Sequence, residues 1–169
     1  FFCQLGFRVV LSPPSSERLY LKGIETIPSE SACYPAKLVH GHIEHLIERK
    51  VDRIFFPSVT YEWQETKGSD HHFNCPVVST YTEVVRTNID SISLYQVPYH
   101  NPFINFNHLE SVEKVLFDEF RNLGIRRGEV KKAVQAAWQE LQSAREEIRA
   151  KGKEVVKWLV ENNQPGIVL

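Results

Sequence analysis

The 169-residue sequence lacks an excess of basic charge, a long apolar run and a dense set of cysteines. Twenty Lys and Arg residues against 21 Asp and Glu give a formal net charge of −1. This balance argues against the clustered basic surface that nucleic-acid binding needs. No apolar run approaches the roughly 18 residues of a transmembrane helix, so we expect no membrane span and no membrane partner. Three cysteines, Cys3, Cys33 and Cys75, are too few and too scattered for a disulfide scaffold.

Several motifs that carry chemistry are also missing. The sequence contains no G-x-G-x-x-G, no Walker A loop and no G-x-S-x-G elbow. We therefore do not expect a nucleotide site or a serine hydrolase, and the chain alone is not expected to be a complete enzyme. No secretion signal is visible, which favours a reducing, cytoplasmic location.

The order of apolar runs predicts one α/β domain over residues 1–169. We expect strands at residues 7–11, 51–60, 75–80 and 165–169, and helices at 17–23, after Cys33, at 81–92, at 107–124 and at 129–162. Alternating strands and helices favour a mainly parallel sheet flanked by helices, with a long C-terminal helix. The opening and closing segments read as interrupted elements, so we expect an excised fragment of a larger multidomain protein.

Three residues at the ends of predicted elements could carry chemistry. Cys33 precedes a helix start, Ser58 follows the strand "RIFFP", and Cys75 precedes the run "PVVST". Such junctions can meet at one edge of a parallel sheet, and a thiolate at a helix N-terminus is stabilised by free N–H groups. The cysteines could equally be small buried packing residues. The neighbouring pocket candidates are Glu30, Tyr34, Lys37, Tyr61 and Glu62.

Histidines offer a second candidate site. His72, Cys75 and Cys33 could together bind zinc, because Cys and His are its usual ligands. The alternative is that these histidines hold no metal. In that case, we expect His42 to pack along an apolar helix face and His40 to face solvent.

Five stretches carry a resemblance to a known family: "LGFRVVLSPPSS", "ETIPSESACYPAKLVHGHIEHL", "VDRIFFPSVTYE", "FNCPVVSTYTEVV" and "NQPGIVL". Together they resemble a domain of unknown function found in proteins related to the CoA-substrate-specific enzyme activases. The same resemblance extends to the 2-hydroxyacyl-CoA dehydratases, the group of 2-hydroxyglutaryl-CoA dehydratase and benzoyl-CoA reductase. It covers nearly the whole chain.

The resemblance implies a Rossmann-like fold and a site for a [4Fe–4S] cluster used in electron transfer. Cys33 and Cys75 match two cluster cysteines of the dehydratase subunits, whereas Ser58 stands where the related domains carry a third. Serine is a rarer and weaker iron ligand, which puts the third position in doubt. The implied partners are ATP-binding activase modules and dehydratase-like modules of the same or another chain.

A different reading is a non-catalytic scaffold or interaction domain. The serine at position 58 and the long helix at residues 129–162 favour it. The apolar stripe of that helix is wide enough to pack on the sheet, which is the arrangement we expect, although it could also form a dimer surface. A CoA-binding module without a cluster is a third reading that rests on the resemblance alone.

Overall fold

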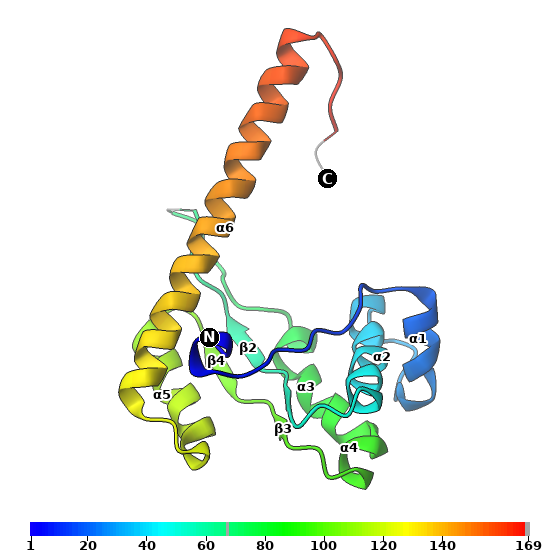
Figure 1. Ribbon diagram of the computed structural model, residues 1–169. Helices are drawn as coiled ribbons and strands as arrows, with labels where there is room; N and C mark the ends of the chain where they lie inside the picture. Colours follow the sequence, from blue (N-terminus) through cyan, green and yellow to red (C-terminus); the bar gives the residue numbers. More distant parts are fainter. Residues whose placement is uncertain (67, 168–169) are drawn as a thin grey trace.

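The computed structural model describes residues 1–66 and 68–167 and is a mixed α/β structure (Figure 1). Its strands form two parallel pairs, β1 with β3 and β2 with β4. The Phe56 N–H donates to the His100 carbonyl at 2.9 Å and the Ser58 N–H to the Pro102 carbonyl at 3.0 Å, so the pairs form one interrupted ladder. The strands are β1 (Ile54–Phe55), β2 (Ser58–Tyr61), β3 (Tyr99–His100) and β4 (Phe103–Asn105).

Helices cover both faces of this ladder. Ile54 and Phe55 are consecutive residues and therefore point to opposite faces. Ile54 packs in a cluster with α2, α3 and α4, whereas Phe55 packs against a second cluster with α5 and α6. The arrangement confirms the predicted mixture of helices and parallel strands; the Rossmann-like assignment stays a prediction. These helices are α2 (Tyr34–Glu48), α3 (Pro76–Asn88), α4 (Asp90–Leu94), α5 (Leu109–Phe120) and α6 (Arg127–Glu161).

Local signals set several helix ends as predicted. The Ser16 hydroxyl accepts a hydrogen bond from the Leu19 N–H at 3.2 Å and caps α1 (Glu17–Gly23). Gly6 and Gly124 end the short 3-10 turns at Cys3–Leu5 and Arg121–Leu123 with φ of 85° and 77°. These left-handed conformations suit glycine because it has no Cβ.

Two glycines bring α1 into direct contact with α2. A Cβ on Gly23 would lie 2.3 Å from the Gly41 main-chain nitrogen, and a Cβ on Gly41 would lie 1.8 Å from the Leu19 carbonyl oxygen. No side chain fits between these backbones. The 3-10 turn Ile24–Thr26, which follows α1, is thereby held against α2.

Three strand predictions differ from the structure. Residues 75–80 open helix α3, with Cys75 at its N-cap and Pro76 in its first turn, where a missing N–H leaves no bond unmade. Residues 7–11 are extended but belong to no strand. Of the strand predicted at 165–169, residues 165–167 are not in a strand, and residues 168–169 lie outside the described part.

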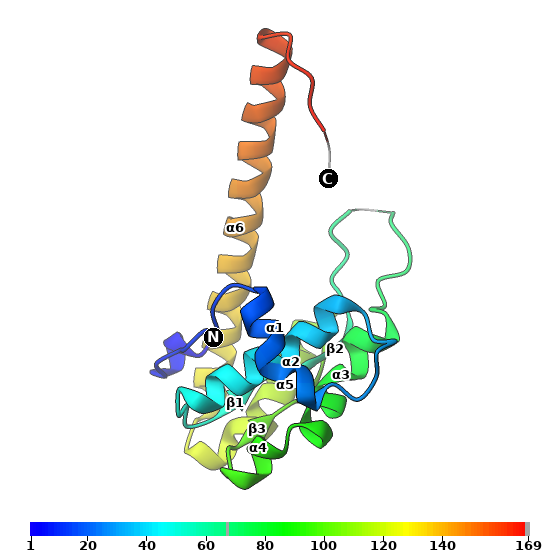
Figure 2. The same ribbon diagram turned by 90° about the vertical axis from the view of Figure 1, so that its right-hand side faces the viewer.

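Helix α6 runs without a break from Arg127 to Glu161, through Gly152. The first turns of α6 bury Val130, Ala133 and Val134 against α5, and its middle contacts Trp63 and Glu65 through Trp138 and Arg145. Only the part beyond Arg149 projects away from the other elements (Figures 1 and 2). The expected packing of the whole stripe on the sheet is therefore wrong. Within residues 1–66 and 68–167, no helix is both long and apolar enough to cross a bilayer.

Candidate functional site

The same local element occurs twice, at the starts of α2 and α3. Cys33 and Cys75 are the N-cap residues, with φ and ψ of −62° and 150° and of −61° and 157°. A proline lies in the first turn of each helix, and α2 packs on α3. The Val78 N–H donates to the Cys75 sulfur at 3.5 Å, whereas the Cys33 side chain makes no cap bond. Both cysteines are exposed, as is Cys3, so none is the buried packing residue of the alternative interpretation.

A buried hydrogen-bonded chain lies beside Cys33. The Thr26 hydroxyl donates to the Gly23 carbonyl at 2.9 Å, so its oxygen accepts from His40 Nδ1 at 2.7 Å. His40 Nε2 is then free to accept from the Tyr81 hydroxyl at 3.1 Å. Since each atom has one role, the chain fixes a neutral His40 with its proton on Nδ1.

Burial shifts both titratable groups in this chain. His40 is fully buried, and burial lowers its pKa below the ordinary histidine value. Burial also raises the pKa of Tyr81, and the charge of nearby Cys33 raises it further. His40 lies on α2 and Tyr81 on α3, so the hydrogen bond between them joins the two helices.

His40 should make the protein sensitive to mild acid. Its pKa is lowered in the folded state, so below about pH 6.5 the unfolded chain takes up a proton that the folded chain does not. Stability is full above that pH and falls by at most about 1.4 kcal/mol per pH unit below it. Urea unfolding from pH 7.5 to 5.5 would measure the slope, and His40→Gln should flatten it. An unchanged slope in that variant would remove His40 as the cause.

Ser58 lies inside the protein, away from the exposed cysteines. Its side chain is fully buried at the start of β2, and its hydroxyl is 2.5 Å from the hydroxyl of Thr82, the residue after Tyr81 on α3. Tyr99 donates to the Thr82 carbonyl at 3.0 Å, and burial together with Glu83 raises the pKa of Tyr99. Ser58 thus connects β2 to α3 in the core.

The segment between β2 and Cys75 is tied to β2 and to α6. Tyr61 pairs with Phe73, and Asn74 donates from its side chain to the Val59 carbonyl and to a Glu62 carboxylate oxygen, both at 3.1 Å. Further along, Trp63 stacks on Trp138 of α6 with ring centroids 4.6 Å apart, and Glu65 pairs with Arg145 at 2.7 Å. Tyr61 and Glu62 thus hold in place the segment of chain that leads to Cys75.

The remaining pocket candidates lie around the start of α2. Glu30 is exposed, and Tyr34 is exposed with its ring 5.4 Å from that of Tyr20 on α1. Lys37 is half-buried, and its N–H donates to the Cys33 carbonyl at 3.2 Å as part of the helix. Within the described part of the chain, no ion pair or side-chain hydrogen bond joins Glu30 or Lys37 to either cysteine.

A metal ion needs several ligand side chains that converge on one point. In residues 1–66 and 68–167, no three His, Cys, Asp or Glu side chains come together to hold an ion. The zinc site from Cys33, His72 and Cys75 is therefore not formed. The same residues do not by themselves make a complete ligand set for a cluster.

His40 is fully buried, whereas its sequence context predicted a side chain that faces solvent. The buried face of α2 is Ala36, His40, Ile43 and Ile47, a spacing of four, three and four residues. His42, which we expected to pack along the apolar face, is instead half-buried beside Ser12 and Ser15. Gly41 was the available signal, because a glycine inside a helix often marks a close backbone contact.

The whole chain, residues 1–169, matches a family model described as the CoA enzyme activase uncharacterised domain. No curated protein and no solved structure matches it.

Proposed function

The chain belongs to the CoA enzyme activase uncharacterised domain family, and on this premise we propose that it is a dehydratase-like module that presents two cysteine ligands. Cys33 and Cys75 are the proposed ligands, and the remaining ligands come from another module of the parent protein. One observation carries the proposal: an exposed cysteine N-cap followed by proline occurs at the start of two packed helices.

The chemistry of this element suits an anionic sulfur ligand. Main-chain N–H groups in the first turn of a helix have no partner within the helix and favour negative charge nearby. The Val78 N–H already points to the Cys75 sulfur. Hydrogen bonds to cysteine sulfurs are one means by which proteins tune iron–sulfur clusters.

The chain supplies only part of a cluster site. The thiols of Cys33 and Cys75 are exposed, while the Ser58 hydroxyl is buried and engaged by Thr82, so it does not provide the third ligand. A bound [4Fe–4S] cluster would supply one-electron transfer. The role of this polypeptide is to hold two sulfurs at the starts of two helices. The hydrogen bonds from Tyr81 to His40 and from His40 to Thr26 keep α2 in place against α3.

Cysteine variants of the parent protein test the proposal. We expect Cys33→Ser and Cys75→Ser each to lower iron bound after anaerobic reconstitution by about tenfold or more, because a lost ligand weakens binding at least as much as a lost supporting contact. Iron analysis and the visible absorption of thiolate-bound iron provide the readout.

Cys3→Ser is the matched control, since Cys3 is exposed but lies in the turn Cys3–Leu5, away from both helix starts. It should leave the iron content unchanged. Equal iron in all three variants would overturn the proposal. The 169-residue chain alone should bind little iron, as its described residues form no complete set.

A second candidate function is a non-catalytic interaction domain, favoured by the outer half of α6. Ile148, Val155 and Leu159 share one face at helical spacing, and Ile148 and Val155 are 72% and 48% exposed. Exposed apolar residues at this spacing are typical of a helix that pairs with another helix.

Charge substitutions on α6 test this candidate. We expect Ile148→Glu with Val155→Glu to abolish self-association of the 169-residue chain at tens of micromolar, because the acidic side chains interrupt the apolar stripe. Ser143→Glu with Ala150→Glu adds the same charge to the other side of the helix and should leave it intact. Identical sedimentation of both double variants would exclude this face as an interface.

A further inference from the structure

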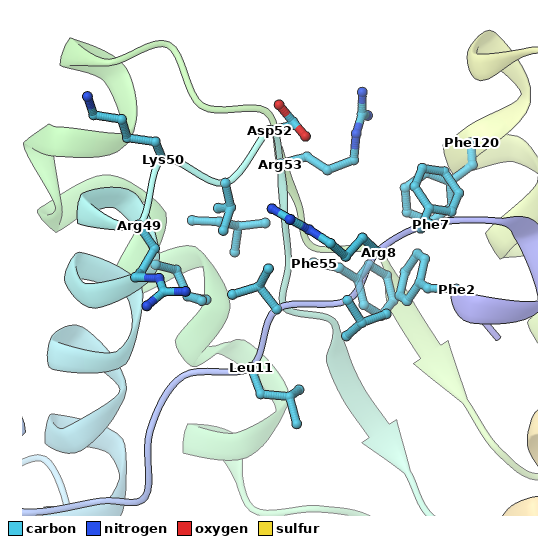
Figure 3. A pocket seen from close by; sticks show the side chains of 15 residues that line it. Phe2, Phe7, Arg8, Leu11, Arg49, Lys50, Asp52, Arg53, Phe55 and Phe120 are labelled. Carbon is cyan, nitrogen blue, oxygen red and sulfur yellow. The ribbon is translucent and has the colours of Figure 1, made fainter.

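A groove of about 760 Å³ separates the extended segment 7–11 from the segment that leads into β1 (Figure 3). Residues 7–11 line one side, and residues 49–55 line the other. Phe2 and Phe120 close one end with their rings 5.5 Å apart. The groove therefore lies directly beside the parallel ladder.

In residues 1–66 and 68–167, the main-chain groups on the groove side of β1 have no hydrogen-bond partner. The N–H groups of Ile54, Phe56 and Ser58 all donate toward residues 98–102. Main-chain groups alternate along a strand, so the N–H and carbonyl of Phe55 point the other way. Pro57 has no N–H, which limits this open edge to the residues before it.

The opposite wall is also unpaired. In the described part of the chain, no main-chain hydrogen bond involves residues 8–11, although the run is rich in strand-forming residues. Val9 is 45% and Leu11 83% exposed. Parallel strands normally occur in sheets of several strands buried on both faces. Two extended segments with free edges on either side of one groove are the pattern left when an intervening strand is absent.

We propose that a β-strand from the polypeptide preceding Phe1 in the parent protein lies in this groove and joins β1 to residues 7–11. Its chemistry is that of a short extended peptide with apolar side chains, held mainly by main-chain hydrogen bonds. Parallel neighbours need a crossover, usually a helix. The turn Cys3–Leu5, ended by the left-handed Gly6, has the form of a helix end leading into residues 7–11. The reason to place a strand here is the unpaired main chain of both walls, and it does not depend on the residue at which the chain begins.

A phosphorylated ligand is the competing occupant. Arg8, Arg49, Lys50 and Arg53 line the groove with a single acid, Asp52, and in the described residues none of the four basic side chains pairs with a carboxylate. An anion would neutralise these positive charges. The main-chain groups of both walls would still lack hydrogen-bond partners, and Val9 and Leu11 would still be exposed. A strand satisfies the main chain of both walls.

Amide hydrogen exchange compares the 169-residue chain with the longer parent protein. We expect the Phe55 amide and alternate amides of residues 8–11 to be protected at least about a hundredfold more in the parent. Proline variants sharpen the test. In the parent, only one of Val9→Pro and Val10→Pro should abolish protection at Phe55, because one N–H faces the inserted strand and the other faces outward. Neither should change Phe55 exchange in the 169-residue chain.

Three results would overturn the proposal. The first is equal Phe55 exchange in the two proteins. The second is a dimer of the 169-residue chain that survives the α6 double variant and protects Phe55, which would place a second copy in the groove. The third is micromolar binding of pyrophosphate or ATP to the parent that is lost in Arg49→Ala with Arg53→Ala. None of these measurements depends on iron, so the cysteine proposal stands or falls separately.

Discussion

Gly41→Ala is expected to destabilise the protein by about 3 kcal/mol or more, the upper range for overpacking in a core. The added Cβ would lie 1.8 Å from the Leu19 carbonyl oxygen, and that oxygen belongs to a helix backbone that cannot rotate away. Helix α1 must therefore separate from α2. The turn that carries Thr26 follows α1, so the bond between Thr26 and His40 should be lost as well.

Chemical unfolding measures this loss, and proton resonances of the His40 ring report on the buried chain. Gly152→Ala is the matched control, because its Cβ would meet nothing within 4 Å on exposed α6. That variant should gain up to about 1 kcal/mol, the usual advantage of alanine over glycine inside a helix. Similar stability of the two variants would show that α1 and α2 are not in direct backbone contact.

Phe120→Ala is expected to destabilise the protein by about 4 kcal/mol, as is typical of removing a buried phenylalanine. Phe120 is 1% exposed and ends α5. Its ring centroid lies 5.5 Å from that of Phe2, 5.8 Å from that of Phe55 and 4.8 Å from that of His100. One side chain thus connects the N-terminal turn, β1, β3 and α5, so its removal leaves a cavity where these elements meet.

The urea midpoint of Phe120→Ala should fall without a change in slope. Phe103→Ala removes the same side chain from β4, where it is 55% exposed, and should change stability by less than about 1 kcal/mol. Equal effects of the two substitutions would mean that the aromatic cluster around Phe120 is not packed as described.

Capping and turn residues predicted the fold best. Ser16, Pro35 and Gly124 each act within a few residues of their own position, so their effect can be read without knowing the tertiary structure. The run at residues 75–80 shows the limit of such reasoning. Its β-branched residues favour a strand, but Cys75 caps a helix and the Thr80 hydroxyl donates to the Pro76 carbonyl at 2.8 Å within it.

The candidate site could be predicted only in part. Cys33 and Cys75 were identified because helix starts and element junctions are visible in sequence. The Tyr81–His40–Thr26 chain was not, since it joins residues 41 and 14 positions apart that only packing brings together. The burial of Ser58 against Thr82 was missed for the same reason.

Cysteine at both helix starts is not the residue that selection for folding stability alone would favour. Serine is among the best N-cap residues, whereas Cys33 makes no side-chain cap bond and Cys75 makes only one, at 3.5 Å. A chain shaped for folding alone would have serine at both places and would be the more stable for it. If both thiols bind iron as proposed, the stability lost at these two helix starts is the cost of that function.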